Sequence, residues 1–312
     1  MLPAKPRPAA RLGIATVSFF PDLSMLSRQL GALPDDALKL IVDNSGAGAA
    51  RDALKALLLG WPEVRLIENA ENRGIAAAFN QAASQLAALG CSEVLLLDQD
   101  SEPHPGAVSL LWAQWVALNR QDARVAAVGP CLFEPDSSVQ HGFHRMRFGL
   151  WTRHFPTEGA STPVPLANLN GSGTLMSLSV YLALGGLDES LFIDHVDTEW
   201  SFRLKASGYQ LLGLPAVRFD HRMGQATMRV WLLGWRAWPA RSPLRHYYVC
   251  RNTLSLLLRR YVPLTWKFWA LVRMVLNYAV YLGPGEGRAS QRNEMRRGVA
   301  DGWRGRMGLR PS

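Results

Sequence analysis

Short apolar runs alternate with helical segments through the first 130 residues, and this alternation limits the possible folds more than any other feature. Strands are predicted at 13–19, 40–42, 64–67, 94–97 and 125–128, and helices at 24–30, 53–59, 75–89 and 108–119. Strands that alternate with helices favour a parallel, doubly wound sheet flanked by helices. The sequence therefore predicts an α/β fold, whose ligands bind at the carboxyl ends of the strands.

A second block follows a stretch with little periodicity. Residues 131–170 are rich in Pro, Gly and His, so we interpret them as an irregular connection. A Gly-Ser-Gly turn at 171–173 opens the second block. Beyond it we expect a helix at 179–184, a loop at 185–194, a helix at 197–207 with Gly208 as its C′ residue, and strands at 210–214 and 217–219.

Charge is divided unevenly along the chain. The net charge is +9, but residues 222–312 hold 17 Lys and Arg against 3 Asp and Glu, and also six of the 11 Trp. This asymmetry predicts a catalytic domain over 1–225 and a basic, helical C-terminal region over 226–312. Aromatic side chains beside cations suit the surface of an anionic membrane. Nucleic-acid binding is the less favoured alternative, because no recognised motif accompanies the charge, and inward packing of the Trp side chains or an oligomer contact is a further one.

Several classes of protein are disfavoured by what the sequence lacks. The three cysteines are far apart and form no C-x-x-C pair, which argues against structural zinc. No G-x-G-x-x-G, P-loop or G-x-S-x-G motif occurs. Prolines interrupt the N-terminus, so no signal peptide is evident, and Lys267 and Arg273 interrupt the apolar stretch 262–282, which disfavours a membrane span without excluding insertion.

Two carboxylates directly follow the predicted strand 94–97. Asp98 and Asp100 are two positions apart and point to the same side of an extended chain. Oxygen ligands at a strand end suit Mg²⁺ or Mn²⁺ bridging a diphosphate, although two acidic residues in a solvated turn would look the same. His221 follows the last strand and is a candidate third ligand, or a structural histidine.

Two other strand ends offer ligand-binding groups. Asp43 could accept a hydrogen bond from the imide N–H of uracil or thymine, or could simply shape a turn. Asn72, Arg73 and Gly74 precede the predicted helix 75–89, where backbone N–H groups and a guanidinium can meet an anion.

The second block holds the candidates for acid–base chemistry. Asp194, Asp197 and Glu199 cluster at the start of a predicted helix, where a carboxylate can act as general base or complement the helix dipole. The Gly171–Gly173 turn could bring the backbone close to a sugar.

Together these fragments resemble inverting nucleotide-sugar glycosyltransferases of family 2, which have a GT-A fold. The resemblance covers about residues 12–260 and follows, in order, the segments 15–19 (ATVSF), 41–45 (IVDNS), 69–80, 95–100 (LLLDQD), 170–173 (NGSG) and 185–203. The Asp-Gln-Asp motif, the stretch 192–200, His221 with Gly224, and 247–252 are most similar to rhamnosyltransferases, which use dTDP-L-rhamnose to build O-antigen and other surface polysaccharides.

The resemblance implies a role for each matching residue. Asp197 is the general base, with Asp194 as its competitor because the family's usual Glu-Asp-x-Asp is Val-Asp-Thr-Glu here. Asp100 and His221 bind the divalent metal. The nucleotide sugar contacts Val17, Phe19, Asp43, Asn72, Arg73, Gly74, Asp98 and Gln99, and the acceptor contacts Gly171, Ser172, Gly173, Glu199 and Trp200.

The implied reaction is a single displacement that inverts the anomeric carbon. The expected partners are dTDP-L-rhamnose or another nucleotide sugar, a lipid-linked saccharide acceptor and the inner face of the cytoplasmic membrane. A homo-oligomer is left open. A UDP-sugar-dependent transferase of the same fold, a metal-dependent phosphohydrolase and a catalytically silent sugar-nucleotide scaffold are the rival readings.

Overall fold

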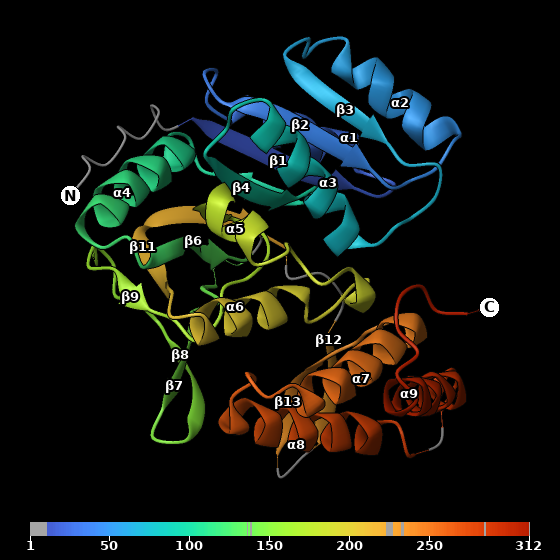
Figure 1. Cartoon of the computed structure of the whole chain (residues 1–312). Coiled ribbons are helices and arrows are strands. Elements are labelled where there is room, and N and C mark those ends of the chain that lie inside the picture. The colour runs from blue at the N-terminus through green and yellow to red at the C-terminus, as the bar shows by residue number, and fades with distance from the viewer. Residues whose placement is uncertain are drawn as a thin grey trace.

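The computed structural model describes residues 11–135, 137, 139–222, 227–231, 234–283 and 285–311. A mixed sheet with helices packed on it forms one part of the molecule, and helices from the end of the chain lie together beside it (Figure 1). Gly224 and the proline-rich residues 1–10, both used in the sequence analysis, lie outside the described residues.

The central sheet is mostly parallel, as predicted. Its strands run in the order β3 (Val64–Glu68), β2 (Leu38–Asp43), β1 (Leu12–Ser18), β4 (Glu93–Asp98), β10 (Thr174–Ser177), β6 (Val125–Phe133), β11 (Gln210–His221) and β5 (Ser101–Pro103), with β9 (Val164–Pro165) pairing with β11. The first four strands are parallel, and β10 is inserted antiparallel between β4 and β6. The carboxyl ends of β1, β2 and β4 therefore meet at one edge.

Apolar side chains cover both faces of this sheet. Successive strand residues point to opposite faces, so Ala15 joins the cluster with Phe79 of α3 (Ile75–Ala88), while its neighbour Ile14 joins the cluster with Trp115 of α4 (Ala107–Gln121). The helices that complete these two layers are α1 (Leu23–Gly31), α2 (Ala49–Leu58), α3 (Ile75–Ala88), α4 (Ala107–Gln121), α5 (Leu178–Ala183) and α6 (Val196–Ala206). Each falls within a few residues of its predicted range, and Gly208 takes a positive φ just beyond α6, as expected of a C′ glycine.

Two predictions about the middle of the chain were wrong. Residues 131–170 are not wholly irregular: they contain the end of β6, the hairpin β7 (Phe143–Arg147) and β8 (Leu150–His154), and β9. The two strands expected at 210–219 are one strand, β11, whose pairing with β6 shifts register between Leu214 and Arg218. Pro215 lies in this interval and has no N–H to donate, so the ladder is interrupted there without ending the strand.

The basic region is not helical throughout. It opens with the hairpin β12 (Thr227–Trp231) and β13 (Trp235–Pro239), followed by α7 (Pro243–Leu258), α8 (Leu264–Val280) and α9 (Arg288–Trp303). Among the described residues, none of the helices combines the length and the apolar character needed to cross a bilayer. Trp266, expected at a membrane surface, is 7% exposed and packs against Phe202 of α6. The division at residue 225 stays a prediction.

Candidate functional site

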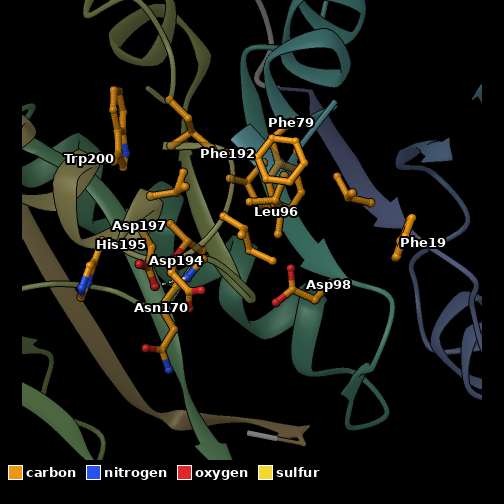
Figure 2. A pocket seen from close by; sticks show the side chains of 18 of the residues that line it. Phe19, Phe79, Leu96, Asp98, Asn170, Phe192, Asp194, His195, Asp197 and Trp200 are labelled. Atoms are coloured by element: carbon orange, nitrogen blue, oxygen red, sulfur yellow. Dashed lines mark hydrogen bonds between the residues drawn. The ribbon is translucent and has the colours of Figure 1, made fainter. Parts of the chain in front are cut away.

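A cavity of about 430 Å³ opens at the carboxyl ends of β1 and β4 and extends to the start of α6. Figure 2 shows Asp98 on one side of this space, with Asp194 and Asp197 on the other. The predicted residues that line it are Val17, Phe19, Asn72, Gly74, Asp98, Gln99, Asp100, Gly171, Asp194, Asp197 and Trp200. Asp43, Arg73, Ser172, Gly173, Glu199 and His221 are not among its lining residues.

Asp98, Asp100 and His221 form a cluster that fits a divalent cation. One ligand atom from each side chain lies within 4.8 Å of the others, and His221 Nδ1 is 3.6 Å from Asp100 Oδ1. Asp98 Oδ1 is buried and has no hydrogen-bond partner among the described residues. A buried carboxylate oxygen without a donor is costly unless a cation meets it. Two carboxylates and an imidazole suit Mg²⁺ or Mn²⁺, so the residues present fit the predicted metal.

The sheet topology creates this cluster. Strand β5 pairs antiparallel with β11 and places Ser101 opposite His221, whose Nδ1 is 3.0 Å from the Ser101 hydroxyl. Ser172 Oγ accepts a hydrogen bond from the Asp98 backbone N–H at 3.0 Å, and Gly173 N–H donates to the Leu96 carbonyl. Ser172 and Gly173, which the resemblance assigns to the acceptor, thus hydrogen-bond to β4, the strand that carries Asp98.

Burial affects the charge of Asp98. Desolvation is the main cause that raises the pKa of Asp98 to about 6; the charges of Asp100 and Asp197 act in the same direction, while His221 and Arg245 oppose the shift. A bound cation would stabilise the ionised form of a carboxyl whose pKa burial has raised. The same cation would meet the Asp98 oxygen that has no hydrogen-bond donor.

Asp197 lies across the cavity, in the first turn of α6. Its Oδ2 accepts from the Gly171 N–H at 3.2 Å, and its Oδ1 accepts from the Thr198 N–H at 2.7 Å. Burial raises the pKa of this carboxyl above its ordinary value, against these hydrogen bonds. No arginine or lysine pairs with Asp197 among the residues that the structure describes, so it is a fixed carboxylate of enhanced basicity facing the cavity.

Asp194 is held differently. Its carboxylate receives two hydrogen bonds from Arg245 of α7, and it sits in the loop before α6 with a φ of +64°. Phe192 and His195 also have positive φ, so three residues of this short loop adopt a conformation that L side chains rarely take. The Asn252 amide of α7 lies within 2.9 Å of the carbonyls of Leu191, Ile193 and Asp194, which fixes the loop.

Asp43 is buried and already satisfied. Its Oδ1 accepts from Ser18 and Ser45, and its Oδ2 accepts from Arg51 at 2.9 Å. Its neighbour Asn44 lines the cavity instead, and donates to the Gly74 carbonyl. Direct contact of Asp43 with a base stays a prediction.

The entrance to α3 forms another wall. Asn72 Oδ1 accepts from the Gly74 N–H at 2.9 Å, and Gly74 has a φ of +83°. A Cβ atom at Gly74 would lie 2.7 Å from Phe192, so only glycine fits between α3 and the strained loop. Arg73 is exposed and does not line the cavity.

Glu199 and Trp200, adjacent in sequence, have different surroundings in the structure. Glu199 is 1% exposed and is bonded to Arg203, Arg259 and Tyr261, so it joins α6 to the C-terminal region and does not face the cavity. Trp200 does line the cavity, and its buried Nε1 has no partner among the described residues.

Sequence reasoning missed Asn170, His195 and Arg245 as cavity residues. Burial lowers the pKa of His195 to about 4, and its Nε2 is 3.0 Å from the Thr253 hydroxyl. Arg245 belongs to the basic region 226–312, and nothing in the local sequence marks its contact with Asp194, 51 positions earlier.

Comparison with known protein families gives a match to Glycosyl transferase family 2 over residues 26–177. Among curated proteins, the dTDP-rhamnosyl transferase RfbF of Shigella flexneri is 29% identical over 80% of this chain and 80% of its own length. An N-acetylglucosaminyl-diphospho-decaprenol L-rhamnosyltransferase of Mycobacterium tuberculosis is 24% identical over 61% of this chain and 68% of its own.

Two solved structures share the fold. GalNAc-T7 with UDP, GalNAc and Mn²⁺ aligns with a TM-score of 0.57 at 14% identity, covering 95% of this chain and 56% of that one. The mannosyltransferase PcManGT from Pyrobaculum calidifontis, in complex with GDP-Man and Mn²⁺, aligns with a TM-score of 0.54 at 14% identity, covering 94% and 87%. The architecture is a GT-A fold, as the resemblance implied.

Proposed function

We propose that this chain, which matches Glycosyl transferase family 2 over residues 26–177 and is related to rhamnosyltransferases, transfers L-rhamnose from dTDP-L-rhamnose to a hydroxyl of a lipid-linked saccharide with inversion. One observation carries the proposal: Asp197 lies across a single cavity from Asp98 and Asp100, which cluster with His221. A base on one side and a diphosphate-binding cluster on the other suit an in-line displacement between them.

The residues divide the work as follows. Asp197 takes the proton from the acceptor hydroxyl, whose oxygen attacks the anomeric carbon from the face opposite the nucleotide. The bond from that carbon to the diphosphate oxygen breaks, and its electron pair leaves with dTDP. When bound, a divalent cation at Asp98, Asp100 and His221 supplies positive charge to the departing diphosphate.

The donor side of the cavity offers contacts that suit a nucleoside. Val17 and Phe19 offer an apolar wall, and Gln99 is fixed by two hydrogen bonds to the Phe19 backbone. The choice of dTDP-L-rhamnose over UDP-sugars rests on the relatives, one of which is described as a dTDP-rhamnosyl transferase.

The lipid-linked acceptor is supported by the other relative and by α8. That relative acts on a diphospho-decaprenol. Leu264, Phe268, Leu271 and Val275 are exposed at helical spacing and form one apolar stripe of α8, which we call the α8 stripe. An apolar stripe on a basic region suits the surface of an anionic membrane, here the cytoplasmic face.

Calorimetric titration of the full chain with dTDP-L-rhamnose, with and without Mn²⁺, tests the donor site. We expect metal-dependent binding that is lost in Asp100→Ala and kept in Asp122→Ala, which removes a partly exposed carboxylate outside the cavity. Tighter binding of a UDP-sugar would show that the donor is a UDP-sugar. The absence of binding by any nucleotide sugar would overturn the proposed function.

A further inference from the structure

A second cavity, of about 170 Å³, lies on the far side of the strained loop. It shares Asp194 and His195 with the first cavity, which holds Asp98 and Asp197 and which we call the catalytic cavity. It is otherwise bounded by β8, the residues before α7, and α7 and α8. The Asp194–His195 segment is thus a wall common to both cavities. A molecule bound in the second cavity would lie next to the carboxylates of the first.

This second cavity is lined by arginines that have no acidic partner. Arg241 and Arg273 both line it, and neither forms an ion pair within the part of the chain that the structure describes. Two other arginines differ from this pair because they have acidic partners. Arg245 is held by Asp194, and Arg259 by Asp188 and Glu199. The one carboxylate in the lining, Asp194, is the one that Arg245 already neutralises.

The unpaired guanidinium groups repel one another. Burial lowers the pKa of Arg273 below its usual value, and the charges of Arg241 and Arg153 lower it further. Like charges held together without a counterion are unfavourable, and an anion placed among them relieves the repulsion. Arg273 combines both features: the surrounding protein lowers its pKa, yet the residue keeps an exposed surface, so an anion can reach the cavity from solvent.

A third cavity continues the path outward. Its volume is about 450 Å³, and it shares Trp151, Trp269 and Arg273 with the second. Trp238 and Leu276 add to its lining, so it is largely apolar and aromatic. Trp269 is 38% exposed and lies on α8, the helix that carries the α8 stripe.

We propose that Arg241 and Arg273 bind the diphosphate of a prenyl-diphosphate-linked saccharide, with its sugar pointing past His195 toward Asp197 and its prenyl chain lying on Trp151 and Trp269. This inference rests on the proposed function and deepens it. Guanidinium groups suit phosphate oxygens, which they meet with two parallel hydrogen bonds. The order of the three cavities matches the order sugar, diphosphate and hydrocarbon in such an acceptor.

Binding of farnesyl diphosphate to the full chain tests the pocket directly. The titration is done by calorimetry with dTDP and Mn²⁺ present in excess, so that the donor site is filled. We expect binding to wild type that weakens at least about tenfold in Arg273→Gln and in Arg241→Gln. Arg304→Gln, which removes an exposed charge at the end of α9, is the matched control and should bind as wild type does. Equal affinity in the pocket variants, or no binding to wild type, would overturn the proposal.

Transfer kinetics separate this inference from the proposed function. With the lipid-diphosphate acceptor, Arg273→Gln should raise the KM for acceptor and leave the KM for dTDP-L-rhamnose unchanged. With an alkyl glycoside that carries the same sugar and no diphosphate, the variant should equal wild type. If dTDP-L-rhamnose does not bind at all, the proposed donor is wrong. The farnesyl diphosphate titration still tests the cavity lined by Arg241 and Arg273. A variant that affects both acceptors equally would contradict the diphosphate assignment.

Discussion

Arg245 of α7 holds both carboxylate oxygens of Asp194, with Nε 2.8 Å from Oδ2 and Nη2 2.7 Å from Oδ1. The contact joins the basic C-terminal region to the loop that precedes α6. It also distinguishes the two aspartates at this wall, because Asp194 is neutralised by a cation and Asp197 is not. Arg245 therefore has a structural and an electrostatic part in the site.

Replacement of Arg245 by glutamine should loosen this loop. Asp194 would keep a mostly buried charge without its partner, and we expect a loss of about 1–3 kcal/mol after allowing for the partial exposure of Arg245. Thermal unfolding should show a Tm several degrees lower, and kcat should fall with it. Arg245→Lys keeps the charge without the paired geometry and should fall between. A Tm equal to wild type in Arg245→Gln would contradict the role.

The base assignment can be tested by two matched substitutions. Asp197→Asn should lower kcat by about 10²–10⁴-fold, since asparagine cannot take the proton, with binding of dTDP-L-rhamnose unchanged. Asp194→Asn should cost stability through its lost ion pair and reduce kcat less. The reverse order of kcat values would make Asp194 the base.

The pH dependence of the reaction follows from the burial of Asp197. Its pKa is raised, so the carboxyl is protonated and inactive at a pH where an ordinary aspartate, with a pKa near 3.8, is already ionised. The logarithm of kcat should therefore rise with pH with unit slope and level off above the raised pKa. This rise should lie at a higher pH than an ordinary aspartate would give. Measurement across pH 4–8 at saturating substrate checks this. The residual rate of Asp197→Asn should lack that limb.

Gly74→Ala should damage the donor wall more than its backbone strain alone explains. The added Cβ would meet Phe192 at 2.7 Å, in a residue with a φ of +83°. Gly90→Ala is the matched control, because Gly90 has the same φ and nothing within 4 Å of its added Cβ. Gly90→Ala should lose about 1 kcal/mol from its unfavourable φ. Gly74→Ala should lose more, because its ψ of 163° lies in a region essentially restricted to glycine, and only Gly74→Ala should also weaken nucleotide-sugar binding. Equal behaviour in both assays would mean that the contact with Phe192 is unimportant.

The α8 stripe should govern binding to anionic vesicles. Phe268 is 60% exposed on this stripe, and Phe268→Asp should reduce co-sedimentation with phosphatidylglycerol vesicles at least about tenfold, because an apolar contact becomes a repelled charge. Leu59, which is 85% exposed beside α2, gives the control Leu59→Asp with an equal charge change. Membrane binding that both variants lose equally would reflect net charge alone.

The first half of the fold was predictable because its signals are local. β1, β2 and β4 are each dominated by apolar residues that are close together in the sequence, and each helix between them has its own periodicity. Strand β10 was missed since its four residues follow a glycine turn and pair with strands far away in sequence. The hairpins β7–β8 and β12–β13 depend on cross-strand contacts in the same way.

The site was predictable where its residues end strands. Asp98 is the last residue of β4 and Asp100 lies two positions beyond it, and their meeting with His221 was expected. The contact between Arg245 and Asp194 was not, because only the packed position of α7 brings the two together. The burial of Glu199 also depends on a distant partner, Tyr261, that no local pattern indicates.

The amide of Asn252 gathers three carbonyls of the loop that ends at His195. A shortened chain that stops before α7 would retain the sheet and the carboxylates of Asp98 and Asp100, but it would lose the Asn252 and Arg245 contacts that hold the loop in its unfavourable conformation. The C-terminal region therefore cannot be exchanged between relatives as an independent module. Chimeras that aim to change the acceptor must transfer α7 together with the loop it holds.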